Sequence, residues 1–68
     1  MCEKEFLEEF AKILEEEKVD MEDCLEDFDG WDSLAVMTLF RLYEKNQKKV
    51  FLKDVLEAEY VKDLWQLF

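Results

Sequence analysis

The chain has 68 residues, of which 9 are Lys or Arg and 19 are Asp or Glu, so its net charge at neutral pH is −10. This length allows one small domain, residues 1–68, and this charge excludes a protein that binds nucleic acid phosphates or an anionic membrane surface. A domain of this size buries only about 60% of the surface that its unfolded chain exposes, which argues against a deep substrate pocket and a self-contained enzyme.

The composition favours an all-α fold. Half of the residues are hydrophobic, proline is absent and glycine occurs once, so the chain should fold but lacks the turns of a many-stranded protein. Apolar residues recur at helical spacing, and we predict three longer helices and one short helix around a single core. The first helix is expected over about residues 3–16. Its apolar stripe consists of Phe6, Leu7, Phe10, Ile13 and Leu14.

Residues 17–32 are predicted to form a long loop, because the helical periodicity weakens there while acidic residues accumulate. Four apolar side chains are expected to hold this loop against the core: Val19, Met21, Leu25 and Phe28. Trp31 is expected to pack over the loop rather than to bind a substrate.

The second helix is predicted over about residues 33–46, with Asp32 as the N-cap whose carboxylate accepts from backbone amides of the first turn. Its buried stripe is expected to consist of Val36, Leu39, Phe40 and Tyr43. The opposite side then carries Leu34, Met37, Arg41 and Lys45. Two apolar residues near the start of this helix are therefore predicted to face solvent.

A polar connector follows, and then one helical turn at Leu52–Leu56 and a final helix that reaches the C-terminus. The buried stripe of the final helix is expected to consist of Val61, Leu64, Trp65 and Phe68. Tyr60 precedes this helix and offers no evident side-chain cap for its start.

The sequence offers no set of side chains that favours catalysis or a dedicated metal site. There is no histidine to serve as the base of a hydrolytic triad or as a zinc ligand. Asp27, Asp29 and Gly30 match the third, fifth and sixth positions of a calcium-binding EF-hand loop. The first and twelfth positions would be Leu25 and Val36, which supply no oxygen ligands, so we expect neither an enzyme nor a metal protein.

The chain is expected to be cytoplasmic. No apolar run is long enough to span a membrane, and the first residues lack the basic start and apolar block of a secretory signal. Cys2 and Cys24 lie outside any Cys-x-x-Cys motif and are expected to be reduced thiols.

Charge is distributed unevenly along the chain. Residues 1–33 carry 14 acidic residues and 3 lysines, whereas residues 34–68 carry 5 acidic and 6 basic residues. A solvated acidic surface that keeps a small protein soluble accounts for this pattern, and so does steering toward basic partner surfaces. The two explanations are compatible.

Ser33 is the only serine of the chain. The segment Asp29-Gly30-Trp31-Asp32-Ser33-Leu34 resembles the Gly-x-Asp-Ser-Leu motif at which acyl carrier proteins carry 4′-phosphopantetheine on the serine hydroxyl. The first helix, the long loop and the short third helix resemble those of the same family, and Val61-Lys62-Asp63-Leu64 is similar to the Val-x-Asp-Leu that opens its last helix. The resemblance implies an acyl-carrier-like four-helix bundle with a covalent 4′-phosphopantetheine cofactor on Ser33.

The resemblance also implies roles for the residues around Ser33. Gly30 would keep the approach to the hydroxyl open, Asp32 would help to position the modifying transferase, and Leu34 completes the attachment motif. The surface that partner enzymes contact would consist of Leu34, Met37, Arg41, Asp27 and Asp29.

The implied function is that of a monomeric carrier, which holds an acyl or aminoacyl group as a thioester in fatty acid, polyketide or non-ribosomal biosynthesis. Its partners would be a phosphopantetheinyl transferase, an acyl- or aminoacyl-loading ligase, and acyltransferases or condensing enzymes. The alternative is a carrier-like interaction module that is never modified and acts through its acidic face.

One departure from the family bears on the choice of partners. Carriers of the fatty-acid synthase type usually have several acidic residues on the second helix, which meet basic grooves on their partner enzymes. Here Glu44 is the one acidic residue of that helix. The other positions where such carriers have acidic residues hold Ala35, Thr38, Arg41 and Lys45. We therefore expect dedicated partners.

Overall fold

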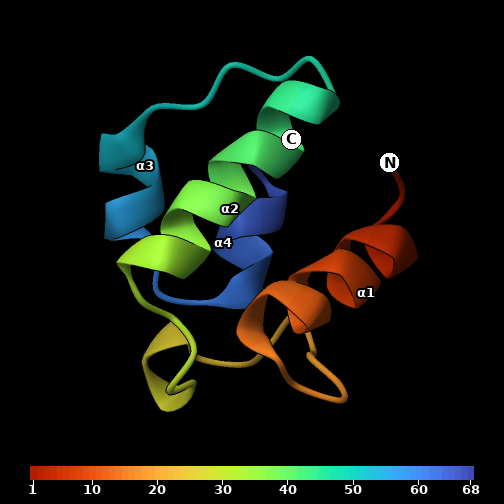
Figure 1. Cartoon of the computed structure of the whole chain (residues 1–68), viewed down its shortest axis with the longest axis vertical. Helices are drawn as coiled ribbons and strands as arrows, with labels where there is room; N and C mark the ends of the chain where they lie inside the picture. Colours follow the sequence, from red (N-terminus) through yellow and green to blue (C-terminus); the bar gives the residue numbers. More distant parts are fainter.

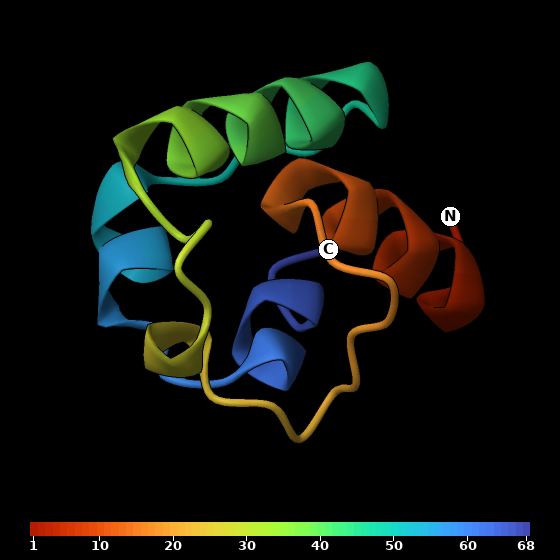
Figure 2. The same cartoon turned by 60° about the horizontal axis from the view of Figure 1, so that its bottom comes forward.

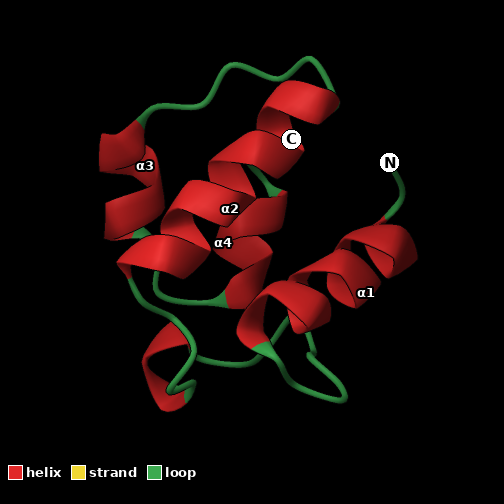
Figure 3. Cartoon of the chain, viewed as in Figure 1, coloured by secondary structure: helices red, strands yellow, loops and turns green.

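The computed structural model describes all residues, 1–68, as four α-helices and one turn of 3₁₀-helix, without a β-strand (Figures 1 and 3). The elements in chain order are α1 (Glu3–Leu14), η1 (Leu25–Asp27), α2 (Ser33–Lys45), α3 (Leu52–Glu57) and α4 (Val61–Trp65). The prediction of an all-α fold is confirmed. Figure 2 shows α1 and α3 on either side of α4, with α2 above them and the long loop below.

The prediction of three longer helices is wrong, because α4 has only 5 residues and stops at Trp65. Beyond it the backbone N–H of Leu67 donates to Leu64 at 3.2 Å and that of Phe68 donates to Trp65 at 3.0 Å, so the chain tightens into a turn. This turn brings the Phe68 ring to 4.8 Å from the Tyr43 ring and 5.4 Å from the Phe6 ring, measured between centroids. The aromatic contacts explain why the last residues depart from a helix.

A single cluster of twelve buried hydrophobic side chains forms the core. Its members are Phe6, Phe10, Ala11, Leu14, Val19, Leu25, Ala35, Leu39, Tyr43, Val55, Val61 and Leu64. No charged side chain is buried. In α2 the buried stripe is rotated from the predicted one, since Ala35 is buried while Val36 and Phe40 are only half-buried.

Tyr43 connects α2 to α4 inside the core. Its side chain has no exposed surface, and its hydroxyl donates a hydrogen bond of 2.7 Å to the backbone carbonyl of Leu64. Burial raises the pKa of the Tyr43 phenol far above its ordinary value, so the hydroxyl remains a donor.

The long loop between α1 and α2 is fastened to residues 59–62, which end the connection after α3 and begin α4. Val19 and Leu25 are buried and Met21 and Phe28 are half-buried against the core, as predicted. Backbone hydrogen bonds join the two segments: Leu25 donates to Glu59 at 2.9 Å, Val61 to Asp23 at 3.0 Å, and Lys62 to Met21 at 3.0 Å. The loop that leads to Ser33 is thus part of the packed structure.

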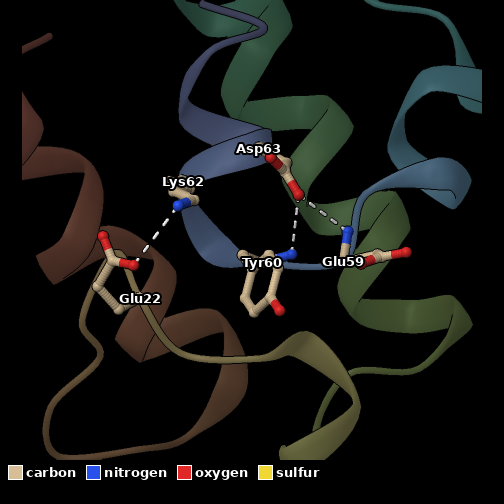
Figure 4. Close-up of polar contacts among 5 residues, drawn as sticks. All are labelled: Glu22, Glu59, Tyr60, Lys62 and Asp63. Atoms are coloured by element: carbon tan, nitrogen blue, oxygen red, sulfur yellow. Dashed lines mark hydrogen bonds and ion pairs between the residues drawn. The ribbon is translucent and has the colours of Figure 1, made fainter.

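Asp63 caps the start of α4, for which the sequence predicts no side-chain cap at Tyr60. Its carboxylate accepts hydrogen bonds from the backbone N–H groups of Tyr60, at 3.0 Å, and of Glu59, at 3.1 Å (Figure 4). These two hydrogen bonds, that of Tyr60 first, hold the pKa of Asp63 below its ordinary value. Lys62 adds an ion pair of 3.5 Å to Glu22 in the long loop.

Replacement of Asp63 by alanine is expected to lower the free energy of unfolding at neutral pH by about 1 kcal/mol, the usual cost of a lost helix cap. Because the pKa of Asp63 is lower in the folded chain than in the unfolded chain, this stabilisation is present above the ordinary value of 3.8 and is lost as the pH falls below it. Urea unfolding at several pH values measures the effect.

The difference between wild type and Asp63→Ala should therefore close in acid. Glu44→Ala, which removes an exposed carboxylate of α2, is the control and should change stability by no more than about 0.5 kcal/mol. A difference for Asp63→Ala that stays constant with pH would contradict the assigned role.

Candidate functional site

Ser33 is the first residue of α2, and its side chain is exposed. Asp32 is the N-cap, as predicted, because its Oδ1 accepts a hydrogen bond of 2.9 Å from the backbone N–H of Ala35. Since Asp32 makes the cap, the hydroxyl of Ser33 is not needed for it. The hydroxyl stands at the positive end of the α2 dipole, which favours a negative group attached there.

A cleft of about 460 Å³ opens beside Ser33, between the first turns of α2 and the helix α3. The residues that line it are Trp31, Asp32, Ser33, Val36, Met37, Leu52 and Leu56. Its walls are mainly apolar, and Asp32 and Ser33 supply its polar edge. Figures 1 and 2 both show α3 beside the beginning of α2.

The sequence did not reveal Leu52 and Leu56 as residues of the site. They lie one helical turn apart on α3 and keep 53% and 65% of their surface exposed, while Val55 between them is buried. From the sequence, any of the three apolar side chains of this six-residue helix could be buried. The i and i+4 spacing of Leu52 and Leu56 was the one available signal that these two share a side of the helix.

Trp31 joins the cleft to the core. Its ring makes an edge contact with the ring of Phe10 in α1, with 5.7 Å between the centroids. The side chain is half-buried and also forms part of the cleft wall. Trp31 therefore packs against α1 as well as over the loop, and it borders the cleft next to Ser33.

Leu34 and Met37 face solvent, as predicted, with 71% and 58% of their surface exposed. They border two different hollows. Met37 lines the cleft between α2 and α3, whereas Leu34 lines a hollow of about 250 Å³ between α1 and α2, together with Ile13 and Thr38. The two residues thus form a ridge between the hollows, and Arg41, also exposed, continues it one turn further along α2.

Gly30 allows a close contact between the loop and α1 that the sequence did not reveal. A Cβ atom built on Gly30 would lie 2.5 Å from the backbone oxygen of Leu14, at the end of α1. The backbone of the loop can therefore approach α1 only where there is no side chain. This contact by itself is enough to account for the glycine.

Asp27 and Asp29 are exposed, Asp27 in η1 and Asp29 in the segment that leads to Ser33. Neither lines the cleft or the hollow beside Leu34. The structure brings Ser33, Asp32 and Met37 together at one cleft, and these two carboxylates remain outside it.

The structure contains no metal-binding cluster, no membrane-spanning helix and no disulfide. No three or more Cys, Asp or Glu side chains come together in a way that could hold a metal ion. No helix combines the length and apolar character needed to cross a membrane. Cys2 is exposed and Cys24 half-buried, and both are thiols outside any disulfide.

Comparison with family models, with curated proteins and with solved structures finds no match for this chain. A functional assignment therefore depends on the residues around Ser33 and on their geometry.

Proposed function

We propose that the protein is an acyl carrier: it bears a 4′-phosphopantetheine arm on Ser33 and delivers an acyl or aminoacyl group, held as a thioester, to partner enzymes. The observation that carries the proposal is an exposed hydroxyl at the start of a capped helix, directly beside an apolar cleft. The segment Asp29–Leu34 adds the resemblance to the attachment motif.

The chemistry of attachment fits these surroundings. A transferase joins the oxygen of Ser33 to the phosphopantetheine half of coenzyme A, and the nucleotide half leaves as an adenosine bisphosphate. The new phosphodiester is anionic, and the N-terminal end of α2 favours a negative charge at this position. Ser33 needs no base of its own, since the transferase removes the hydroxyl proton. The carrier itself would not be an enzyme.

The cleft offers a place for the group that the arm carries. Met37 from α2 and Leu52 and Leu56 from α3 present apolar surface next to the attachment point. Apolar parts of a cargo would lose contact with water there, and the hydrophobic effect would favour their return to the cleft between transfers. Partner enzymes would be a loading ligase, acyltransferases or condensing enzymes.

The proposal is tested by the intact mass of the protein after incubation with coenzyme A and a permissive phosphopantetheinyl transferase. We expect a single adduct of one phosphopantetheine on the wild type and none on Ser33→Ala. Thr38→Ala is the matched control, because it removes the one threonine hydroxyl, also on α2, and should leave the adduct unchanged. A wild type that stays unmodified, in vitro and when isolated from its own cells, would contradict the proposal.

The second candidate is an unmodified interaction module that acts through its acidic face. It is favoured by the 14 acidic residues within positions 1–33 and by the absence of buried charge, which leaves these carboxylates at the surface. A protein without an adduct that still binds a basic partner would support this candidate.

A further inference from the structure

Basic residues are concentrated in one stretch of this acidic protein. Five of the nine lie within residues 41–53: Arg41, Lys45, Lys48, Lys49 and Lys53. All five side chains are exposed, and none of them takes part in an ion pair, since the three ion pairs of the protein involve other lysines. Three acidic residues lie among or beside them, so residues 37–57 have a net charge of +2 in a chain of −10.

The same part of the molecule carries exposed apolar surface. Met37, Leu52 and Leu56, which converge on the cleft, each expose more than half of their side chains. Phe51, directly before α3, exposes 63% of its surface. Isolated exposed apolar residues are normal, but several of them around one cleft indicate a surface that contacts a partner.

Three positive groups lie beside residues of this apolar centre, although none of them lines the cleft itself. Arg41 follows Met37 by one turn on α2 and is its neighbour on the helix surface. Lys53 is the residue after Leu52 in α3. The Nζ atom of Lys49 lies 5.9 Å from the centre of the Phe51 ring. We name this surface the α2–α3 face, with Met37, Leu52 and Leu56 as its centre and Arg41, Lys49 and Lys53 as its rim.

We propose that the α2–α3 face docks a partner protein whose contact surface has an apolar centre and a rim of carboxylates. Apolar contact at the centre would supply the affinity, and carboxylates opposite the rim would supply orientation and specificity. Because the rim cations have no acidic partner within the protein, no internal ion pair has to be broken when the partner binds.

Charge complementarity favours a protein surface over an anionic membrane. The molecule measures only 26 × 23 × 19 Å. A plane of anionic lipid against the α2–α3 face would therefore also come close to the acidic half, residues 1–33, whose net charge of −11 would repel it. At physiological ionic strength charges act over about 8 Å, so a partner with a small footprint responds mainly to the charges of the α2–α3 face.

This inference extends the partner surface implied for Met37 and Arg41 to α3 and adds the charge of the partner, and it does not require that Ser33 be modified. If Ser33 carries the arm, the face adjoins it, because Ser33 and Met37 line the same cleft. The docked partner would then be an enzyme that acts on the cargo, and its docking site would be acidic.

The test uses two synthetic amphipathic helical peptides with the same leucine face, one flanked by glutamates and the other by lysines. Each is titrated into the isotope-labelled full chain at an ionic strength of about 0.15 M, where the local charges dominate. We expect the glutamate peptide to shift the backbone amide signals of residues 37–41 and 51–56, and to bind less tightly as salt increases. The lysine peptide should shift only signals of the acidic half.

The matched variants change the net charge equally. The triple replacement Arg41→Glu, Lys49→Glu and Lys53→Glu should weaken binding of the glutamate peptide about tenfold. The control places glutamate at Lys4, Lys12 and Lys18 of the acidic half and should leave this affinity unchanged. If the first variant fails to fold, Arg41→Glu alone, together with the salt dependence, gives the same comparison.

Four outcomes would overturn the inference. They are binding of the lysine peptide to the α2–α3 face, failure of the glutamate peptide to bind there up to millimolar concentration, binding of phosphatidylserine vesicles through this face, and self-association through it in sedimentation experiments. The proposed carrier function is judged separately, by the mass adduct on Ser33 of the wild type.

Discussion

Phe10→Ala is expected to lower the free energy of unfolding by about 3–5 kcal/mol, as is usual for truncation of a buried aromatic ring. Phe10 has no exposed surface; its ring stacks on that of Phe6 at 5.6 Å and meets that of Trp31 at 5.7 Å, between centroids. A domain of this length has a total stability of about 3–10 kcal/mol. The variant should therefore lose about a third or more of the stability of the domain.

Urea unfolding followed by far-ultraviolet circular dichroism measures this loss. Phe51→Ala is the matched control, because it removes the same ring from a position that is 63% exposed, and it should change the stability by no more than about 0.5 kcal/mol. Equal unfolding midpoints for the two variants would mean that Phe10 does not hold α1 to the loop as described.

Gly30→Ala is expected to lower the stability by about 1–3 kcal/mol, the usual cost of forcing extra atoms into a packed region. The added Cβ would lie 2.5 Å from the backbone oxygen of Leu14, an atom that the end of α1 holds in place, so a side-chain rotation cannot relieve the contact. The loop would have to move away from α1, and Trp31 and Asp32 would move with it.

Differential scanning calorimetry measures this effect, since each 1 kcal/mol corresponds to a shift of about 4–8 °C in the melting temperature of a small domain. Asp29→Ala, at the exposed preceding position, serves as control and should melt close to the wild type. If both variants melt together, the loop is not in close contact with α1.

The two long helices could be predicted from the sequence because their apolar residues keep a helical period over several turns. The predicted spans of 3–16 and 33–46 differ from Glu3–Leu14 and Ser33–Lys45 by no more than two residues at each end. Which side of α2 is buried was less certain, since Ala35 and Val36 are adjacent and the position of the neighbouring helices decides between them.

The exposed serine at the start of α2 and its capping aspartate were also within reach of the sequence, because a serine and an aspartate at a helix start have a local geometric meaning. The cleft was not. The exposure of Leu52 and Leu56 and the contact of Gly30 with Leu14 depend on distant parts of the chain meeting, which no local spacing records. Asp63 was missed as a cap because its carboxylate reaches back to the start of its own helix.

The hydrogen bonds between residues 21–25 and 59–62 have a consequence for the way the chain folds. They join segments that are far apart in the sequence, and one of these segments, residues 59–62, includes the first two residues of the shortest helix. A five-residue helix is too short to persist alone in water, so α4 gains its stability only when the earlier loop is already in place. Such non-local dependence raises the contact order and favours all-or-none folding over stepwise assembly of separate helices.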